Sequence, residues 1–304
     1  MNAGDTETML QIDGLTHTYA NGVQALRGLT LDIPRGMFGL LGPNGAGKST
    51  LMRIVATLQQ PSGGRVTFDG VNVLAEPQRL RRALGYLPQE FGVYPRVSAE
   101  DMLDHLAVLK GLSNKAERRE QVTALLQQTN LYDVRKKALS GFSGGMRQRF
   151  GIAQALLGDP RLIIVDEPTA GLDPEERNRF HGLLSEIGEN VVVILSTHIV
   201  DDVADLCPRM AIIEGGQIVA QGDPAALIEG MRGRVWRKVV AKAEVEAYRQ
   251  SHQVIATRLV GGRSVLHVLA DSDPGAGFEA VAGDLEDVYF AALYQRRHPA
   301  VLAA

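Results

Sequence analysis

The sequence predicts an α/β protein whose core is a parallel sheet, preceded by an antiparallel sheet and interrupted by a helical insertion. Three observations support this fold class. Short apolar runs of strand length alternate with segments of helical periodicity. A glycine-rich loop joins the first of the central runs to a helix. Three segments of helical periodicity within residues 99–157 interrupt the series of strands.

Length and composition limit the possible classes of protein. The chain has 304 residues, of which 45% are hydrophobic, enough for one large domain or two modest ones. Its net charge of −3 gives no reason to expect a nucleic-acid partner. The single cysteine, Cys207, excludes an internal disulfide and fits a reducing compartment. We expect no secretion signal and no membrane span, because the longest apolar run, residues 191–195, is far below the roughly 20 residues that a span needs.

Residues 8–36 alternate apolar and polar positions and end in a Pro-Arg-Gly turn. This pattern predicts a small antiparallel sheet. Tyr19 lies on a turn of that sheet, next to Asn21 and Gly22. Its ring is suited to stacking on a nucleotide base, and the alternative is a partly buried sheet tyrosine.

The stretch GPNGAGKST, residues 42–50, matches the phosphate-binding pattern G-x-x-x-x-G-K-[ST]. Its glycines let several backbone N–H groups point into one concavity. Lys48 would reach the outer phosphates, and the Ser49 hydroxyl would ligate Mg²⁺. A strand over 37–41 and a helix over 49–58 should flank the loop. The predicted nucleotide-binding residues of the loop are Gly42, Pro43, Asn44, Gly45, Ala46, Gly47, Lys48, Ser49 and Thr50.

Polar residues follow three further apolar runs. These runs are residues 83–87, 161–165 and 191–196. Because a carboxylate at the end of a buried strand is costly unless it faces a cation, we interpret Asp166 as the acid on the Mg²⁺ side and Glu167 as the base for the attacking water. The amide oxygen of Gln89 could ligate the metal or orient that water. Parallel strands end at one edge of a sheet, so His198 should share the pocket and touch a γ-phosphate.

The helical insertion contains a second candidate anion site. Its expected helices are residues 99–110, 116–129 and 144–157. Ser143 can cap the third of these helices, and Gly144 and Gly145 leave backbone N–H groups open at its start. We expect a chain with two such phosphate-binding helix N-termini to use both.

The composition changes after a predicted hairpin over 209–214 and 217–220. We therefore expect a first domain over 1–224, with a helical subdomain at about 90–158, and an accessory α+β domain over 225–304. The accessory strands are expected at 235–241, 254–260 and 264–269, with helices at 243–251 and 284–294. Its basic stretch, residues 231–238, is interpreted as a solvated face; contact with lipid headgroups or an acidic partner is the alternative.

These motifs, in this order, resemble the ATP-binding subunit of ABC transporters over about residues 8–222. GPNGAGKST resembles the Walker A loop, YLPQ with Gln89 the Q-loop, and FSGGM the signature motif. LIIVDEPTAGLD resembles Walker B running into the D-loop, which ends with Asp173. His198 resembles the switch histidine, and Tyr19 the aromatic residue that stacks on adenine. The signature departs from the family at Phe142, where leucine is commoner.

The resemblance implies a P-loop NTPase fold with an ABC-type antiparallel β subdomain and a helical subdomain, plus a small C-terminal α+β domain. It implies an ATPase that uses ATP and Mg²⁺, with a catalytic set of Glu167, His198, Gln89 and Lys48. Two copies would meet head to tail, each ATP lying between the Lys48 loop of one copy and residues 143–145 of the other. A separate membrane permease would hold the dimer at the cytoplasmic face of the cell membrane.

The tail sequence LEDVYFAAL, residues 285–293, is similar to the C-terminal extension of drug-exporter-type ATP-binding subunits, which favours export. An importer subunit remains an alternative, because it would share residues 8–222. A soluble ABC-type ATPase of translation or DNA repair is disfavoured, because those proteins usually carry two cassettes or a long coiled coil. A GTPase is weaker still, because Asn114-Lys115 is not followed by the aspartate that reads guanine. A degenerate regulator should lack the base or the histidine, and both are present.

Overall fold

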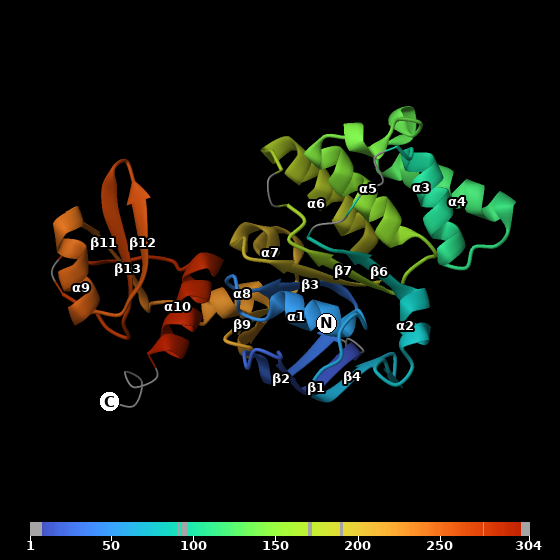
Figure 1. The fold of residues 1–304 in the computed structure, drawn as a ribbon. Coiled ribbons are helices and arrows are strands. Elements are labelled where there is room, and N and C mark those ends of the chain that lie inside the picture. Colours follow the sequence, from blue (N-terminus) through green and yellow to red (C-terminus); the bar gives the residue numbers. More distant parts are fainter. Residues whose placement is uncertain are drawn as a thin grey trace, which may run out of the picture.

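The structure is a computed structural model that describes residues 8–89, 92, 96–169, 172–188, 191–275 and 277–298. Its centre is a six-stranded sheet in the order β10-β9-β3-β8-β7-β6 (Figure 1). All neighbours in this sheet are parallel except the hairpin pair β9 and β10. The predicted central strands and the hairpin are confirmed to within two residues at each end. Their bounds are β3 (Gly36–Leu41), β6 (Leu84–Leu87), β7 (Leu162–Asp166), β8 (Val192–Thr197), β9 (Arg209–Glu214) and β10 (Gln217–Gly222).

The central strands are apolar on both faces, as expected of a buried parallel sheet. In β8, Ile194 packs into the core on one face, and its neighbours Val193 and Leu195 pack into the core on the other. This double burial explains why the strands appear in the sequence as continuous apolar runs rather than as alternating patterns.

An antiparallel sheet in the order β2-β1-β4-β5 covers one side, as predicted. In β2, Leu29, Leu31 and Ile33 are buried at alternate positions, so one face of this sheet reaches the core. Residues of this sheet, of the central sheet and of α1 (Lys48–Val55) share one apolar cluster. The strand bounds are β1 (Thr8–Thr18), β2 (Gln24–Pro34), β4 (Gly63–Phe68) and β5 (Val71–Asn72).

The helical insertion has a small core of its own, built around Phe150, Leu126 and Phe142. Each of its three predicted helices is present and begins at a side-chain cap: Ser98, Asn114 and Ser143. The bounds are α3 (Ala99–Leu109), α4 (Lys115–Gln128) and α5 (Gly144–Leu156), with short 3₁₀ turns at Tyr132–Val134 and Leu139–Gly141.

Among the described residues of the first 230 positions there are four further helices. Helix α6 has 15 residues, whereas the other three are short helices that the sequence did not predict. Helices of six or seven residues span fewer than two turns, so their periodicity is too short to recognise. The bounds are α2 (Pro77–Ala83), α6 (Pro174–Gly188), α7 (Val200–Leu206) and α8 (Pro224–Glu229).

The C-terminal region forms a separate antiparallel sheet in the order β12-β13-β11-β14, with a helix against each face (Figure 1). Helix α10 packs on the sheet through Val288 and also shares an apolar cluster with Val203 of α7 and Ile228 of α8. The predicted domain division after residue 224 remains a prediction. The bounds are β11 (Val235–Val240), a 3₁₀ turn (Lys242–Glu244), α9 (Val245–Ser251), β12 (Val254–Val260), β13 (Arg263–Leu269), β14 (Glu279–Ala280) and α10 (Leu285–Arg297).

Within the described ranges, no helix combines the length and the apolar character needed to span a bilayer. Cys207 is buried at the end of α7, and burial raises the pKa of its thiol to about 12.

Candidate active site

A pocket of about 480 Å³ lies where the central parallel strands end. It brings together most of the residues that the sequence predicts for nucleotide binding and catalysis. Those lining it are Tyr19, Pro43, Asn44, Gly45, Gly47, Lys48, Ser49, Thr50, Gln89, Glu167 and His198. Gly42, Ala46 and Asp166 belong to the segments that form its walls. The lining also includes residues that were not predicted: Val23, Gln24, Ala25, Arg27, Gly215 and Gly216.

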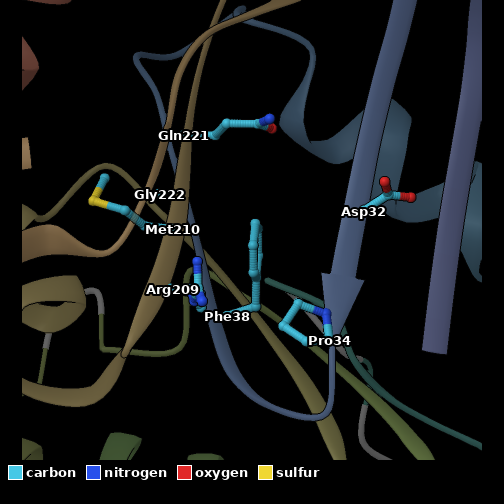
Figure 2. Close-up of a pocket in the computed structure, with 7 residues that line it drawn as sticks. All are labelled: Asp32, Pro34, Phe38, Arg209, Met210, Gln221 and Gly222. Atoms are coloured by element: carbon cyan, nitrogen blue, oxygen red, sulfur yellow. The ribbon is translucent and has the colours of Figure 1, made fainter. Parts of the chain in front are cut away.

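A second pocket, of about 350 Å³, lies near the amino ends of β3 and β9 and contains none of the predicted site residues. Figure 2 shows the Phe38 ring between Asp32 of β2 and Met210 of β9. Since parallel α/β sheets bind ligands at the carboxyl ends of their strands, the candidate active site is the pocket at the phosphate loop.

The phosphate loop is braced by the β9–β10 turn. The backbone N–H of Gly216 donates a hydrogen bond to the carbonyl of Ala46 (2.9 Å), and the carbonyl of Gly216 accepts one from Arg27 N–H (3.0 Å). A side chain at Gly47 would not fit, because a Cβ there would lie 2.6 Å from the carbonyl oxygen of Ala25. Sequence reasoning missed this brace, since the two glycines of the turn indicate only a hairpin.

Lys48, Glu167 and His198 form one contact group beside the loop. The Lys48 ammonium donates to the carbonyls of Gly42 (2.6 Å) and Pro43 (3.3 Å) and lies 3.4 Å from Glu167 Oε1. His198 Nδ1 is 2.6 Å from Glu167 Oε2. Both Lys48 and Glu167 are about 95% buried. The carboxylate is therefore held from one side by a cation and from the other by an imidazole.

The backbone at Glu167 is in the left-handed region, with φ 50°. Residues other than glycine rarely adopt this conformation, and it persists only where the surrounding structure enforces it. Here the N–H of Glu167 donates to the carbonyl of Ser196 on the adjacent strand (2.8 Å). Such local strain is concentrated at functional sites, which fits the predicted role of this residue.

Asp166 is buried beside this group, and one of its oxygens is free. It is 4% exposed, and its Oδ1 has no hydrogen-bond partner within the described part of the chain. Burial raises the pKa of Asp166, and the Glu167 charge adds to this, while the hydroxyls of Ser196 and Ser49 and the Lys48 charge oppose it. A buried carboxylate with a free oxygen is suited to a hard cation.

The described residues contain no group of three or more His, Cys, Asp or Glu side chains placed to hold a metal. A cation beside Asp166 would need further ligands, and the predicted ones, Ser49 and Gln89, both line the pocket.

Tyr19 stands at the far side of the phosphate loop. Its hydroxyl lies 2.8 Å from the hydroxyl of Thr50, and its ring packs edge-on against His17 with centroids 4.7 Å apart. Burial acts to raise the pKa of Tyr19, but hydrogen bonds with Thr50 and Gln59 and the charge of Arg53 outweigh it and lower the pKa. The ring is thus held next to the loop, where a base could meet it.

The signature residues and Asp173 lie outside the phosphate-loop pocket. The Ser143 hydroxyl accepts from Met146 N–H at the start of α5 (3.2 Å), and Gly144 and Gly145 form the first turn. Asp173 caps α6 by accepting from Glu176 N–H (2.9 Å). None of them lines the phosphate-loop pocket. Ala170 and Gly171 of the same D-loop motif lie outside the described residues.

Comparisons with known proteins place the chain in a family. The profile of the family described as "ABC transporter" matches residues 26–170. The chain is 34% identical over 278 residues to the daunorubicin/doxorubicin resistance ATP-binding protein DrrA of Streptomyces peucetius, covering 91% of this chain and 81% of DrrA. It is 31% identical over 262 residues to the linearmycin resistance ATP-binding protein LnrL of Bacillus subtilis, covering 86% and 80%.

Solved structures agree with this placement. The fold is similar to a dimeric ATP-binding cassette, MJ0796, in a post-hydrolysis state bound to ADP and Pi, with a TM-score of 0.65 and 27% identity over 71% of this chain and 98% of that one. It is also similar to cbiO1 from Clostridium perfringens, part of an ABC transporter complex, with a TM-score of 0.66 and 27% identity over 80% and 94%. The chain therefore belongs to the ABC transporter family, as an ATP-binding subunit with the P-loop ATPase fold of that family.

Proposed function

We propose that this chain is the ATP-hydrolysing subunit of an exporter and drives a separate membrane permease from the cytoplasmic face of the membrane. The observation that carries the hydrolytic part is the buried Glu167 carboxylate, contacted by both Lys48 and His198. A cassette that had lost hydrolysis would not need to retain this acid in its strained backbone conformation.

Glu167 acts as the general base in this proposal. Its carboxylate accepts a proton from the water that attacks the γ-phosphate, and His198 orients the carboxylate through the 2.6 Å contact. Lys48 exchanges its bonds to the carbonyls of Gly42 and Pro43 for the outer phosphates of ATP. Gln89 orients the attacking water. Phosphoryl transfer depends mainly on positioning and charge, which these groups supply on the phosphate-loop side of the ATP site.

ATP is held by the phosphate loop and Tyr19. The backbone N–H groups between Gly42 and Thr50 surround the phosphates, and the N-terminus of α1 faces them. The Tyr19 ring stacks on the base.

Mg²⁺ fits the free oxygen of Asp166 together with Ser49 and Gln89. When bound, it would neutralise charge on the outer phosphates. Asp166 and Ser49 supply hard oxygen ligands, which suits this ion better than softer metals.

The second half of each ATP site comes from a second copy. Ser143, Gly144 and Gly145 leave open N–H groups at the start of α5 yet do not line the pocket of their own chain. A head-to-tail dimer would bring them, with Asp173, onto the phosphates held by the other chain. The dimeric cassette among the structural relatives supports this arrangement.

Export is favoured over import by the extent of the alignments. The match to the daunorubicin/doxorubicin resistance protein covers 91% of the chain, so it must include most of residues 225–304. The match to a phosphonates import ATP-binding protein of Chromohalobacter salexigens, at 36% identity, covers 75%. The C-terminal region is therefore shared with proteins named for resistance.

A pull-down tests the proposal. Tagged Glu167→Gln chain is recovered from detergent-solubilised membranes in Mg-ATP, and the proteins that accompany it are identified. The same variant in EDTA and a Lys48→Ala chain are the matched controls. We expect a polytopic permease only with Glu167→Gln in Mg-ATP. Recovery of ribosomes or nucleic acid without a membrane protein would overturn the transporter proposal and leave the ATPase assignment intact.

A further inference from the structure

A buried carboxylate outside the predicted site connects the segments that carry Glu167 and His198. Asp202 lies on α7, has 0% exposure, and was not predicted as a functional residue. We propose that Asp202 is a positioning residue for ATP hydrolysis, which acts by anchoring the backbone on both sides of the Glu167–His198 contact. The inference rests on the proposed role of Glu167 as the base.

Asp202 is contacted by side chains from two other segments. Its Oδ2 accepts a hydrogen bond from the Thr169 hydroxyl (2.5 Å). Its Oδ1 accepts from Arg177 Nε (2.8 Å) and lies 2.9 Å from His181 Nε2. Arg177 Nη2 is also 2.8 Å from Oδ1. Both carboxylate oxygens are therefore engaged, one by the strand-end segment and the other by α6.

The segments joined by Asp202 lie close in sequence to Glu167, His198 and Asp173. Thr169 is two residues after Glu167, and α7 begins two residues after His198. Helix α6, which carries Arg177 and His181, follows directly after Asp173. The Asp202 carboxylate thus connects three segments. They are the residues that follow Glu167, helix α7 that follows His198, and helix α6 that follows the D-loop motif.

The backbone at Glu167 needs such an anchor. Its φ of 50° must be imposed by its surroundings. Glu167 N–H is fixed to Ser196 on the neighbouring strand, and Thr169 is fixed to Asp202. If the second bond is lost, the segment can relax and move the carboxylate, and small displacements of a catalytic group are costly in rate.

The chain contains a matched control for the chemistry of this cluster. Asp287 of α10 is also 0% exposed and is also contacted by a histidine and an arginine, His267 and Arg258. It lies in the C-terminal region, outside the pocket. An effect that depends only on burying a paired aspartate should appear at both positions, whereas a positioning effect should appear only at Asp202.

Steady-state ATP turnover by the full-length chain tests the proposal, using Thr169→Val, Thr169→Ser, Asp202→Asn, Asp287→Asn and Glu167→Gln. Thr169→Val removes only the hydroxyl that reaches Asp202, and Thr169→Ser keeps it. We expect Thr169→Val and Asp202→Asn to lower kcat about 10-fold or more, with KM for ATP within about 2-fold. Thr169→Ser should restore kcat to within about 3-fold of the parent chain, and Asp287→Asn should leave it unchanged. Combining Thr169→Val with Asp202→Asn should cost no more than Asp202→Asn alone.

Equal kcat values for Thr169→Val and Thr169→Ser would overturn the proposal, as would multiplicative losses in the double variant or an equal loss in Asp287→Asn. If Asp202→Asn shows no cooperative thermal transition, the two Thr169 variants decide the matter. The Glu167→Gln variant distinguishes failure of the proposed function from failure of the positioning role. If Glu167→Gln still turns over ATP, Glu167 is not the general base. If Glu167→Gln is inactive and the two Thr169 variants have the same kcat, only the positioning role of Asp202 is rejected.

Discussion

Asp166 at the end of β7 and Asp287 at the start of α10 are both buried aspartates, yet their surroundings differ. Asp287 has partners on both oxygens: Oδ1 is 2.7 Å from His267 Nδ1, and Oδ2 accepts from Asp284 N–H (3.2 Å). Asp166 has a free Oδ1 within the described residues. Burial raises the pKa of Asp166. At Asp284, next to Asp287, burial also acts to raise the pKa, but the Arg258 contacts outweigh it and lower the pKa.

The difference separates a ligand site from a structural cluster. Removing one partner of a fully paired buried charge is costly, because the other partner is left uncompensated. A buried charge with a free oxygen destabilises the folded chain until a cation arrives. The pocket end of the central sheet therefore holds a carboxylate oxygen that is open to a ligand, whereas both oxygens of Asp287 already have partners in the chain.

The largest expected effect is on catalysis, at Glu167. Glu167→Gln removes the proposed base but keeps the shape of the side chain, so kcat should fall by about 100-fold or more. ATP affinity should change little, and the variant should accumulate as an ATP-bound dimer. Turnover assays, nucleotide binding and size-exclusion chromatography with Mg-ATP measure these quantities. Turnover near that of the parent chain would remove Glu167 from the role of base.

The next effect is on stability, at the paired aspartate. Asp287→Asn leaves His267 facing a neutral amide, while Arg258 keeps its ion pairs with Asp284 and Glu286, and the change should lower the free energy of unfolding by about 1–3 kcal/mol. Denaturant unfolding followed at the single tryptophan, Trp236 on β11 of the same sheet, measures the change. ATP turnover per folded chain should stay unchanged. An unaltered midpoint would show that complete pairing contributes nothing here.

The same substitution should have the opposite sign at Asp166, the aspartate with a free oxygen. Asp166→Asn removes a buried charge whose desolvation outweighs its stabilisation by the serine hydroxyls and Lys48, and should raise the free energy of unfolding of the nucleotide-free chain by about 1 kcal/mol at neutral pH. The pKa of Asp166 is raised in the folded state, so ionisation of this carboxyl disfavours the folded state. The contribution of Asp166 to stability is therefore complete below the ordinary carboxyl pKa, and it is lost as pH rises through the raised pKa. The advantage of Asn should therefore appear above that pKa and vanish in acid.

Thermal unfolding of the parent chain and of Asp166→Asn across pH, with and without Mg-ATP, measures whether the substitution stabilises or destabilises the chain. Mg-ATP should stabilise the parent chain more than Asp166→Asn, since only the parent offers the carboxylate. Destabilisation by Asp166→Asn in the nucleotide-free chain at neutral pH would contradict the comparison between the two aspartates.

The smallest effect is expected at Tyr19. Tyr19→Phe keeps the ring and loses the bond to the Thr50 hydroxyl, so ATP affinity should fall about 2- to 3-fold. Tyr19→Ala also loses the stacking surface and should cost about 10-fold. Titration with a fluorescent ATP analogue compares the two. Equal losses would mean that the hydroxyl, rather than the ring, is what matters.

Local sequence patterns were sufficient for the parts of the site whose chemistry is carried by short segments. The phosphate loop is recognisable because a glycine pattern and one lysine occur within nine residues. Glu167 and His198 are recognisable because each follows a continuous apolar strand of a parallel sheet, and such strands end together. The helices of the insertion were predictable because each has a capping residue and at least three turns of periodicity.

The sequence by itself thus determined the order of the strands along the chain, the nucleotide chemistry and the family. Only the tertiary structure decided which distant residues meet: Gly216 against Ala46, Thr169 against Asp202, and α10 against α7 and α8. The physical reason is that these contacts join residues 33 or more positions apart in the chain, as with Thr169 and Asp202. Such pairings depend on how strands and helices stack in three dimensions, and local periodicity reports only which face of an element is buried.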